Sequence, residues 1–282
     1  MPLARTADLV HQAHTLGRGI AAFNVITLEH AEGIVQGAER AGTPVILQIS
    51  ENAVKFHRGR LQPIAAATVA VAAGATVDVS VHLDHVEDTD LLHQAAASGL
   101  SSVMFDASRL DYADNLAATT SAADWAHRHG LYVEAELGKV GGKDGAHAPG
   151  ARTDPHEASE FVAATGVDAL AVAVGSSHAM TDRTAALDLE LIGRLAEALP
   201  VPLVLHGSSG VPDDQLRAAV STGMVKINIG TILNVAFTRA VRSVITGDDT
   251  LVDPRKYLRP GRDELAAVVA RLAAVVRGDE LS

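Results

Sequence analysis

Short runs of apolar, mostly β-branched residues alternate with longer Ala- and Leu-rich amphipathic stretches along nearly the whole chain. Strand patterns are expected at residues 20–25, 45–50, 77–83, 101–105, 131–136, 168–174, 202–206 and 225–229. Helical patterns lie between them, for example at 28–41, 86–98, 111–129, 188–199 and 212–221. Strands that each precede a helix favour a (β/α)8 TIM barrel, an α/β fold. An open doubly wound sheet is less favoured, because no Gly-x-Gly-x-x-Gly motif follows the first strand.

The alternation indicates one barrel domain over residues 1–282, with two stretches that exceed the usual loop length. Residues 138–154 carry five glycines and are expected to form a mobile loop over the active-site end of the barrel. Residues 246–262 are expected to form a polar excursion before a last amphipathic helix at about 262–277. We see no linker and no repeat beyond the strand–helix alternation.

Composition narrows the class of protein. The chain is 48% hydrophobic and 3% aromatic, as expected for a barrel filled with aliphatic residues, and it has no cysteine for thiolate metal sites. A formal net charge of −11 argues against nucleic-acid or anionic-membrane partners, although backbone N–H groups can still bind a phosphorylated small molecule. The N-terminus lacks a signal-peptide pattern, and the longest weakly polar run, 64–77, is too short to span a membrane. A cytoplasmic protein is therefore expected.

Three strand-like runs end at a histidine: His85, His178 and His206. Imidazoles from three strand ends can converge on one divalent metal and leave a fourth position open, as in catalytic zinc sites. Asp84, beside His85, would place a proton-transfer group next to whatever the metal polarises. The sequence therefore predicts a metal-dependent lyase.

The remaining histidines have no partner at ligand spacing. His82 is expected to be a hydrogen-bonded histidine inside the barrel. Those in helical patterns are expected at the surface; they include His11, His14, His30, His93, His127 and His129.

Acidic residues mark two further strands. Glu134 and Glu136 share one face of their strand, and buried carboxylates are costly without partners, so a metal or a buried Arg or Lys is expected nearby. Asp106 ends its strand and is either an acid at the barrel mouth or the cap of the following helix.

Two turns of small residues follow the seventh and eighth strands. They are His206-Gly-Ser-Ser-Gly210 and Asn228-Ile-Gly-Thr231, and each leads into a helix. Many barrels bind phosphate between these two loops, where backbone N–H groups at helix starts are accessible. A phosphate site is therefore predicted there.

Taken together, the motifs from Ala22-Phe-Asn-Val25 to Asp253-Pro-Arg-Lys-Tyr-Leu258 resemble those of the class II, zinc-dependent ketose-bisphosphate aldolases. The resemblance implies that His85, His178 and His206 bind a catalytic Zn²⁺, which polarises the ketone, and that Asp84 exchanges a proton with the C4 oxygen. It also implies a second or alternative metal position at Asp106 and Glu136.

The same resemblance implies a dihydroxyacetone-phosphate cradle, typically with a monovalent cation such as Na⁺ or K⁺. The substrate-binding residues expected from it are Asn24, Ser50, Ala179, Gly207, Ser208, Ser209, Asn228, Gly230 and Thr231. Asp253 and Arg255 match a pair that contacts the distal half of the sugar bisphosphate, often across a subunit interface. A homodimer or homotetramer with a role in glycolysis is thus implied.

Three positions depart from the family pattern without removing a zinc ligand. Ala179 stands where Gly usually follows the second zinc histidine, and Gly230 replaces a more usual Ala or Asp. In the glycine-rich loop, Lys143 and Asp144 stand where a Glu is usual. Asp144 is therefore the expected loop base, which exchanges the proton at the dihydroxyacetone-phosphate carbon.

Fructose 1,6-bisphosphate is the first expected substrate, with tagatose 1,6-bisphosphate or another ketose phosphate as the alternative. Two other hypotheses keep the barrel. One is a Schiff-base aldolase that uses Lys226 of the eighth strand, and the other is a catalytically weak sugar-phosphate-binding protein, suggested by the altered loop.

Overall fold

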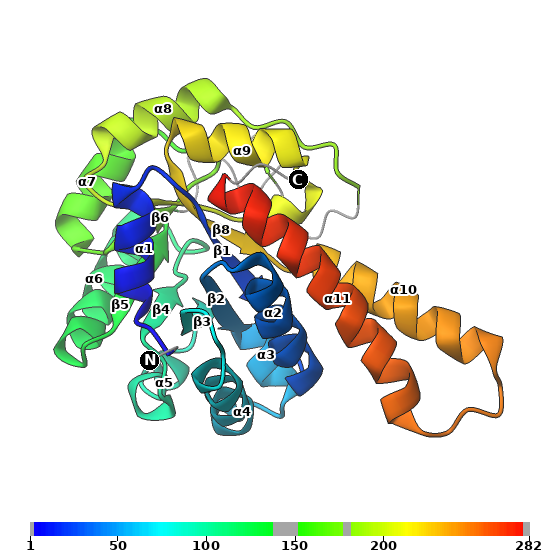
Figure 1. The fold of residues 1–282 in the computed structure, drawn as a ribbon. Helices are drawn as coiled ribbons and strands as arrows, with labels where there is room; N and C mark the ends of the chain where they lie inside the picture. The colour runs from blue at the N-terminus through cyan, green and yellow to red at the C-terminus, as the bar shows by residue number, and fades with distance from the viewer. Residues whose placement is uncertain (1–2, 138–151, 177–181, 279–282) are drawn as a thin grey trace.

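Eight parallel strands pair in chain order and close into a barrel (Figure 1). A computed structural model of the chain describes residues 3–137, 152–176 and 182–278. The strands are β1 (Ile20–Asn24), β2 (Val45–Ser50), β3 (Val79–Val86), β4 (Ser102–Phe105), β5 (Tyr132–Glu136), β6 (Ala169–Ala171), β7 (Leu203–Leu205) and β8 (Met224–Ile229). Parallel pairing of β1 with β8 closes the sheet, which confirms the predicted (β/α)8 TIM barrel.

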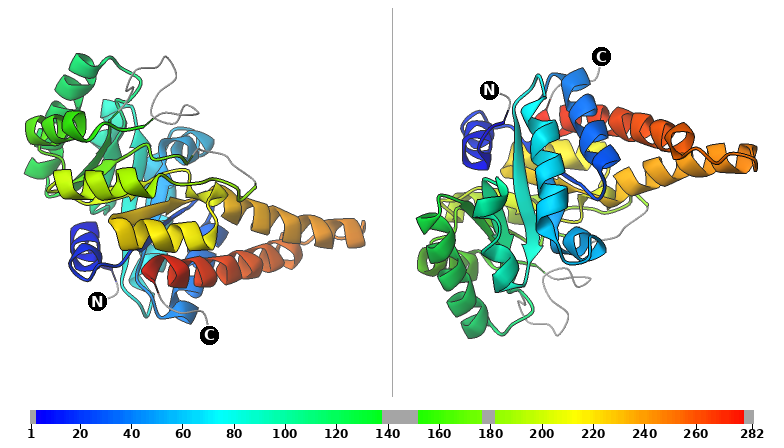
Figure 2. Two further views of the ribbon diagram at one scale, coloured as in Figure 1. Left: turned by 90° about the horizontal axis from the view of Figure 1, so that it is seen from above. Right: turned by 90° about the horizontal axis from the view of Figure 1, so that it is seen from below.

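Helices surround the barrel on its outer side (Figure 2). They are α1 (Thr6–Thr15), α2 (Leu28–Ala41), α3 (Glu51–Phe56), α4 (Leu61–Ala73), α5 (Thr89–Leu92), α6 (Tyr112–Arg128), α7 (Pro155–Thr165), α8 (Leu189–Ala198), α9 (Asp213–Thr222), α10 (Thr231–Gly247) and α11 (Pro254–Arg277), with short 3₁₀ turns η1 (Ala96–Ser98) and η2 (Ser208–Gly210). None of the helices within the described ranges is long and apolar enough to cross a membrane.

Two of the predicted helices differ in extent. The helix expected at 86–98 is reduced to α5 and η1, because β3 continues to Val86 and Gly99 ends the 3₁₀ turn in a left-handed conformation (φ 78°). The last helix begins at Pro254, not near 262. Asp253 caps it by accepting from the Arg255 N–H, and proline is favourable in a first helical turn.

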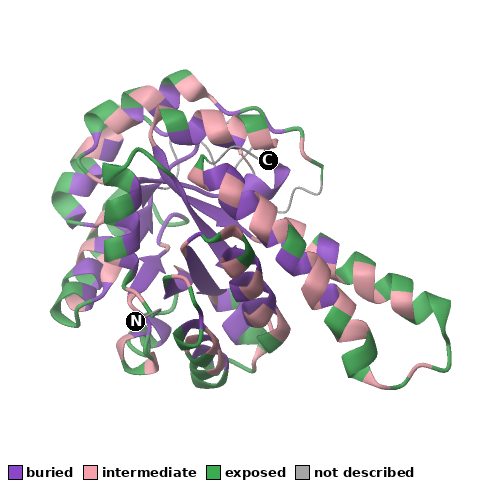
Figure 3. Cartoon of the chain, in the orientation of Figure 1, coloured by how far each residue is buried: buried purple, intermediate pink, exposed green. Residues whose placement is uncertain are grey.

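The last two helices form a hairpin that projects from the barrel (Figures 1 and 2). At its inner end α11 packs on α2 and on β1. Leu233 and Ala236 are the buried residues of α10, and both lie in its first two turns. Figure 3 shows that the outer part of this hairpin is mostly exposed, whereas the strands are buried.

The barrel strands carry both apolar and polar buried side chains. Met104, Ala169, Ala171 and Val204 form one apolar cluster between the strands. Four of the barrel strands each carry a buried polar side chain: Gln48 on β2, His82 on β3, Glu134 on β5 and Lys226 on β8. Buried polar groups need partners, so this cluster directs attention to the adjoining strand ends.

Candidate active site

A β-bulge at the end of β3 sets the direction of two functional side chains. Leu83 pairs with Val103, but the next pair is Val86 with Phe105, so one extra residue lies in β3. His85 has a left-handed backbone with φ 50°, a conformation uncommon outside glycine. Strict strand alternation would place His85 opposite Asp84, whereas the bulge allows both to face the barrel mouth.

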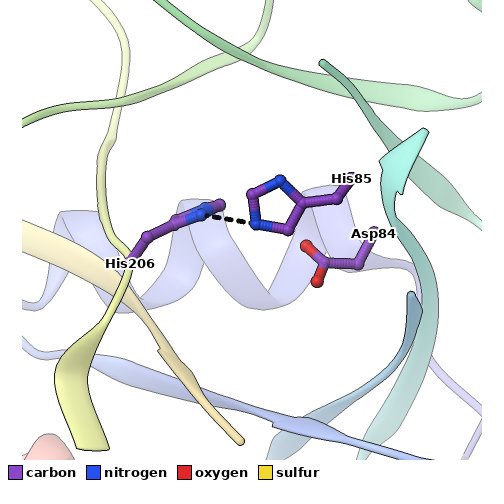
Figure 4. Close-up of side chains that lie close together, drawn as sticks. All are labelled: Asp84, His85 and His206. Carbon is purple, nitrogen blue, oxygen red and sulfur yellow. Dashed lines mark hydrogen bonds between the residues drawn. The ribbon is translucent and has the colours of Figure 1, made fainter. Parts of the chain in front are cut away.

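His85 and His206 converge on one point, with Asp84 beside them (Figure 4). His85 Nε2 lies 3.0 Å from His206 Nδ1, and the rings meet edge to face at 81°. Two imidazole ligands of a tetrahedral zinc ion have nitrogens about 3.3–3.4 Å apart, given Zn–N distances of ~2.0–2.1 Å. The two histidines therefore fit a divalent metal, and they come from the strand ends that the sequence indicated.

Each of these imidazoles is held through its other nitrogen. His85 Nδ1 lies 2.7 Å from Asp106 Oδ2, and His206 Nε2 lies 2.9 Å from Glu134 Oε1. A carboxylate behind a metal-binding histidine fixes the ring orientation and the proton position. Both rings are therefore anchored on the side away from the point where they meet.

Asp106 and Glu136 lie close enough to His85 to form a second candidate metal group, since their ligand atoms are within 4.8 Å of one another. Glu136 Oε2 is also 3.8 Å from His206 Nδ1. Asp106 additionally accepts from the N–H and the hydroxyl of Ser108 in the turn that follows. It does not cap the following helix, because the N-cap position of α6 is Asp111, so the alternative of a helix cap was wrong and Asp106 is an acid at the barrel mouth.

The acidic side chains around His85 and His206 favour a positive charge where the two rings meet. Burial works to lower the pKa of His85, but Asp84 and Asp106 outweigh it and raise that pKa to about 10. Burial likewise works to raise the pKa of Asp106, yet hydrogen bonds from His85 and Ser108 hold that pKa below its usual value. A bound cation would meet the same preference.

Asp84 is a buried acid beside the two histidine rings. Burial raises its pKa, although His85 and Lys226 oppose the shift. The amides of Gln48 and Asn228 each lie 3.4 Å from one of its carboxylate oxygens. Gln48 also donates to Asn24 Oδ1 at 2.7 Å, which ties β1 to the site.

Gln48 was missed by the sequence analysis. The signal was present, because Gln48 is the one amide in the otherwise apolar run before Ser50, and polar residues near barrel strand ends point to function.

Behind the two histidines lies a buried ion pair. Lys226 Nζ donates to Glu134 Oε2 at 2.7 Å and to Asn228 Oδ1 at 2.8 Å, and both charged side chains are fully buried. The expected cationic partner of Glu134 is therefore Lys226. His82 is a hydrogen-bonded interior histidine as predicted, with Nδ1 2.8 Å from Ser102 Oγ.

The two small-residue turns meet at the same mouth. Gly207 adopts the left-handed conformation (φ 66°) before η2, and the Ser208 hydroxyl donates to the Asn228 carbonyl. Ser209 Oγ accepts from the Ile232 N–H at 3.2 Å, in the first turn of α10. The turns after β7 and β8 are thus joined at the start of a helix, which is a favourable position for a phosphate.

A cavity of about 800 Å³ extends from Asp84 and His85 to the two small-residue turns after β7 and β8. The predicted residues that line it are Asn24, Ser50, Asp84, His85, Asp106, Glu136, Gly207, Ser208, Ser209, Asn228, Gly230 and Thr231. A Cβ at Gly230 would lie 3.1 Å from the Asn24 side chain, so glycine permits this close approach. Ser50 also caps α3 by accepting from the Ala53 N–H.

Other predicted residues are not brought to this cavity. Asp253 and Arg255 form an ion pair of 2.9 Å at the start of α11, on the hairpin, and neither lines the cavity. His178, Ala179 and Asp144 lie outside the described residues. One expectation was wrong: His30 is 5% exposed and stacks on Phe237, because α2 packs this face against α10.

Comparison with known proteins gives concordant matches. The family model described as fructose-bisphosphate aldolase class-II matches residues 4–280. The chain is 36% identical over 272 residues to a probable fructose-bisphosphate aldolase of Bacillus subtilis (strain 168), with 95% of each chain covered. It is equally similar, 36% over 272 residues and 95% of each chain, to a fructose-bisphosphate aldolase of Geobacillus stearothermophilus. The solved structure of the YdjI aldolase from Escherichia coli K12 matches with a TM-score of 0.84, 33% identity and 98% of each chain covered.

Proposed function

The chain belongs to the class II fructose-bisphosphate aldolase family and is an aldolase, a carbon–carbon lyase; on that premise we propose that it is zinc-dependent and reversibly cleaves fructose 1,6-bisphosphate. The products would be dihydroxyacetone phosphate and glyceraldehyde 3-phosphate. Residues 1–282 are proposed to form one domain.

The convergence of His85 Nε2 and His206 Nδ1, 3.0 Å apart, carries the proposal. With Asp84 alongside, these groups match the donor set of a catalytic zinc site that lacks one further ligand. His178 is proposed as that ligand. Zinc, when bound there, supplies a Lewis acid that polarises the ketone and stabilises negative charge on its oxygen.

Asp84 is proposed as the base that removes the C4 hydroxyl proton in cleavage. Its position at the cavity wall, and a pKa that burial raises above the usual value, suit a group that takes up and returns a proton. The amides of Gln48 and Asn228 hold the two carboxylate oxygens in place, so Asp84 can return the proton in the reverse reaction. Asp144 is proposed as the base for the second proton transfer.

The turns at Gly207–Ser209 and Gly230–Thr231 are proposed to bind the phosphate of the dihydroxyacetone half. Backbone N–H groups at the start of α10 and the small side chains there would direct that phosphate away from the two histidines. A monovalent cation beside this phosphate and a second metal position at Asp106 and Glu136 are part of the same proposal.

Tagatose 1,6-bisphosphate is the second candidate substrate, because the same donor set would serve the C4 epimer. The Schiff-base alternative is disfavoured by Lys226 itself: its amine donates to Glu134 and Asn228 and is fully buried. A free amine would be needed for attack on a ketone.

We also propose a homo-oligomer in the cytoplasm. Asp253 and Arg255 lie on the projecting hairpin, away from the cavity of their own chain. We propose that they contribute to substrate binding at the cavity of a second subunit.

The decisive experiment is a coupled triose-phosphate assay of fructose 1,6-bisphosphate cleavage, run as purified, after EDTA treatment and after zinc is restored. Loss with chelator and recovery with zinc would support the proposal. Activity that is indifferent to EDTA, with substrate trapped on the protein by borohydride, would refute it in favour of Lys226. The same assay with tagatose 1,6-bisphosphate separates the two substrates.

A further inference from the structure

Lys226 and Glu134 are two oppositely charged side chains that the reaction outlined above does not use, and both are fully buried. Desolvating such a pair costs free energy, so burial of an ion pair is weak evidence for a role in stability. Glu134 lies on β5 and Lys226 on β8, which are not neighbours in the barrel, so the pair spans the barrel interior. The same carboxylate also contacts His206.

The contacts of Glu134 are divided between its two oxygens. Oε2 accepts from Lys226 Nζ at 2.7 Å, and Oε1 lies 2.9 Å from His206 Nε2. A carboxylate oxygen can only accept a hydrogen bond, so the bond between Glu134 Oε1 and His206 Nε2 requires that Nε2 carry the proton. A neutral imidazole with its proton on Nε2 has its lone pair on Nδ1, the atom that faces His85 Nε2.

A second group competes for the same nitrogen. The Asn228 amide nitrogen lies 3.0 Å from His206 Nε2 and could donate to it if Nε2 carried no proton. That arrangement would leave the buried Glu134 Oε1 facing an unprotonated nitrogen, and a charge-assisted bond to a carboxylate is the stronger of the two. Asn228 can direct its amide toward Asp84 Oδ1 instead, at 3.4 Å.

We infer that the Lys226–Glu134 pair is a positioning device: it fixes the proton of His206 on Nε2 and so keeps Nδ1 available as a metal ligand. This inference rests on the metal site of the proposed function. Lys226 contributes by holding the carboxylate in place, since its ammonium donates and never accepts. The pair acts through His206 and is not expected to touch substrate.

The role of Lys226 can be isolated by replacing the carboxylate with an amide. In Glu134→Gln, the carboxamide oxygen must face the Lys226 ammonium, because two donors cannot face each other. Its NH₂ group then faces His206 Nε2 and requires that atom to accept. The proton of His206 moves to Nδ1 and blocks the metal position.

Removing the ammonium as well should reverse this effect. In the double variant Glu134→Gln/Lys226→Met, nothing opposes rotation of the carboxamide, so its oxygen can again accept from His206 Nε2. The inference therefore predicts that the second substitution rescues the first. A pair that only stabilised the fold would give no such rescue of metal binding.

The experiment measures zinc affinity by competition with a chromogenic chelator, using metal-free full-length enzyme. Glu134→Gln should weaken zinc binding about 10–100-fold, in the range of lost outer-shell contacts, and the double variant should regain most of that loss. Asp168→Asn is the matched control. Asp168 Oδ2 contacts His127 Nε2 at 3.0 Å outside the cavity, and its replacement should leave zinc affinity unchanged.

Unchanged zinc affinity in Glu134→Gln, or a further loss in the double variant, would overturn the inference. Nitrogen-15 NMR of the imidazoles in metal-free wild type supplies a test that needs no variant: the proton of His206 should be found on Nε2, and a proton on Nδ1 would refute the inference. If wild type bound no zinc, the proposed function would fail, while the NMR result would still decide the position of the proton.

Discussion

At the residue scale, the properties of the site come from how each polar atom is shared among neighbours. Asp84 has a different amide near each carboxylate oxygen, and His85 and His206 each have a carboxylate behind one nitrogen. Such arrangements fix geometry before a ligand arrives, which lowers the reorganisation needed in the transition state. The consequence is that single isosteric substitutions should separate metal binding from proton transfer.

Asp84→Asn should lower kcat for fructose 1,6-bisphosphate cleavage by about 10²–10⁴-fold, the usual contribution of a positioned acid or base. The amide keeps the size of the carboxylate but cannot take up the C4 proton. Proton exchange at the dihydroxyacetone-phosphate carbon does not require that base, so it should persist, and zinc content should stay at the wild-type level. Steady-state kinetics, tritium exchange and metal analysis together check this; parallel loss of exchange and of zinc would mean that Asp84 serves the metal instead.

Sequence motifs predicted which side chains meet at the barrel mouth better than they predicted how those side chains are arranged. His206 and Asp84 could be predicted because residue type and strand end are both local properties. The bulge that redirects His85 could not, because it depends on how β3 pairs with β4. The partner of Glu134 was anticipated only as some cation, since the choice of Lys226 depends on contact across the closed barrel.

At the scale of elements, the strand pattern gave all eight strands, whereas the ends of helices depended on capping. Asp253 and Pro254 start α11 earlier than the amphipathic pattern indicated, and Pro260 lies inside the helix. Close packing between helices also could not be predicted from the sequence. Glycines of α2 contact α11 so closely that side chains would not fit, and this contact anchors the inner end of the hairpin.

Gly37→Ala should destabilise the protein by about 1–3 kcal/mol, the typical cost of overpacking. A Cβ at Gly37 would lie 2.5 Å from the Ala266 carbonyl oxygen and 2.6 Å from Val269 Cβ, so α2 and α11 would have to separate. The gain in helix propensity, up to about 1 kcal/mol, does not offset this. Urea unfolding of the metal-free enzyme measures the change. Gly247→Ala is the control, because a Cβ there meets no atom within 4 Å, and an equal loss in both variants would contradict the packing argument.

Asp213 at the start of α9 pairs with two arginines from other parts of the fold. We expect these ion pairs to make the stability of the protein depend on pH. It pairs with Arg183 at 2.6 Å and also with Arg271 of α11. Burial works to raise the pKa of Asp213, but the two guanidinium groups outweigh it and lower that pKa. Because the folded-state pKa lies below the unfolded value, the stabilisation is present above that value and is lost as pH falls through the folded pKa.

Asp213→Asn should therefore lower Tm near neutral pH, and its difference from wild type should shrink below about pH 4, near the unfolded pKa of aspartate. Thermal unfolding of the metal-free protein across that range checks the prediction. Glu190→Gln removes an exposed pair with Arg194 and should change Tm little at any pH. A Tm difference for Asp213→Asn that stayed constant with pH would exclude the ion pairs as its cause.

At the scale of the whole molecule, the barrel and the projecting hairpin differ in how much apolar surface they bury. The hairpin exposes Val235, Ile245 and Val252 at 44%, 45% and 88% of their surface. Apolar groups on a projecting helical pair, together with an ion pair at Asp253 and Arg255, are consistent with an isologous contact between two copies of the chain. In such a dimer each cavity would receive Arg255 from the partner subunit.

That arrangement makes a quantitative prediction for mixed dimers. Asp84→Asn removes the base of a subunit's own cavity, whereas Arg255→Ala would remove a contact to the cavity of the partner. Each variant alone should cleave fructose 1,6-bisphosphate poorly. After equal amounts are unfolded or dissociated and allowed to reassociate at random, half of the dimers are hybrids, and one of the two cavities in each hybrid carries neither substitution. A quarter of all cavities in the mixture are then intact, so the cleavage rate averaged over all cavities should recover to roughly a quarter of the wild-type value. If Arg255 acts within its own chain, no hybrid cavity is intact in this way, because the cavities carry one substitution or the other, and the mixture should show only the average of the two variants.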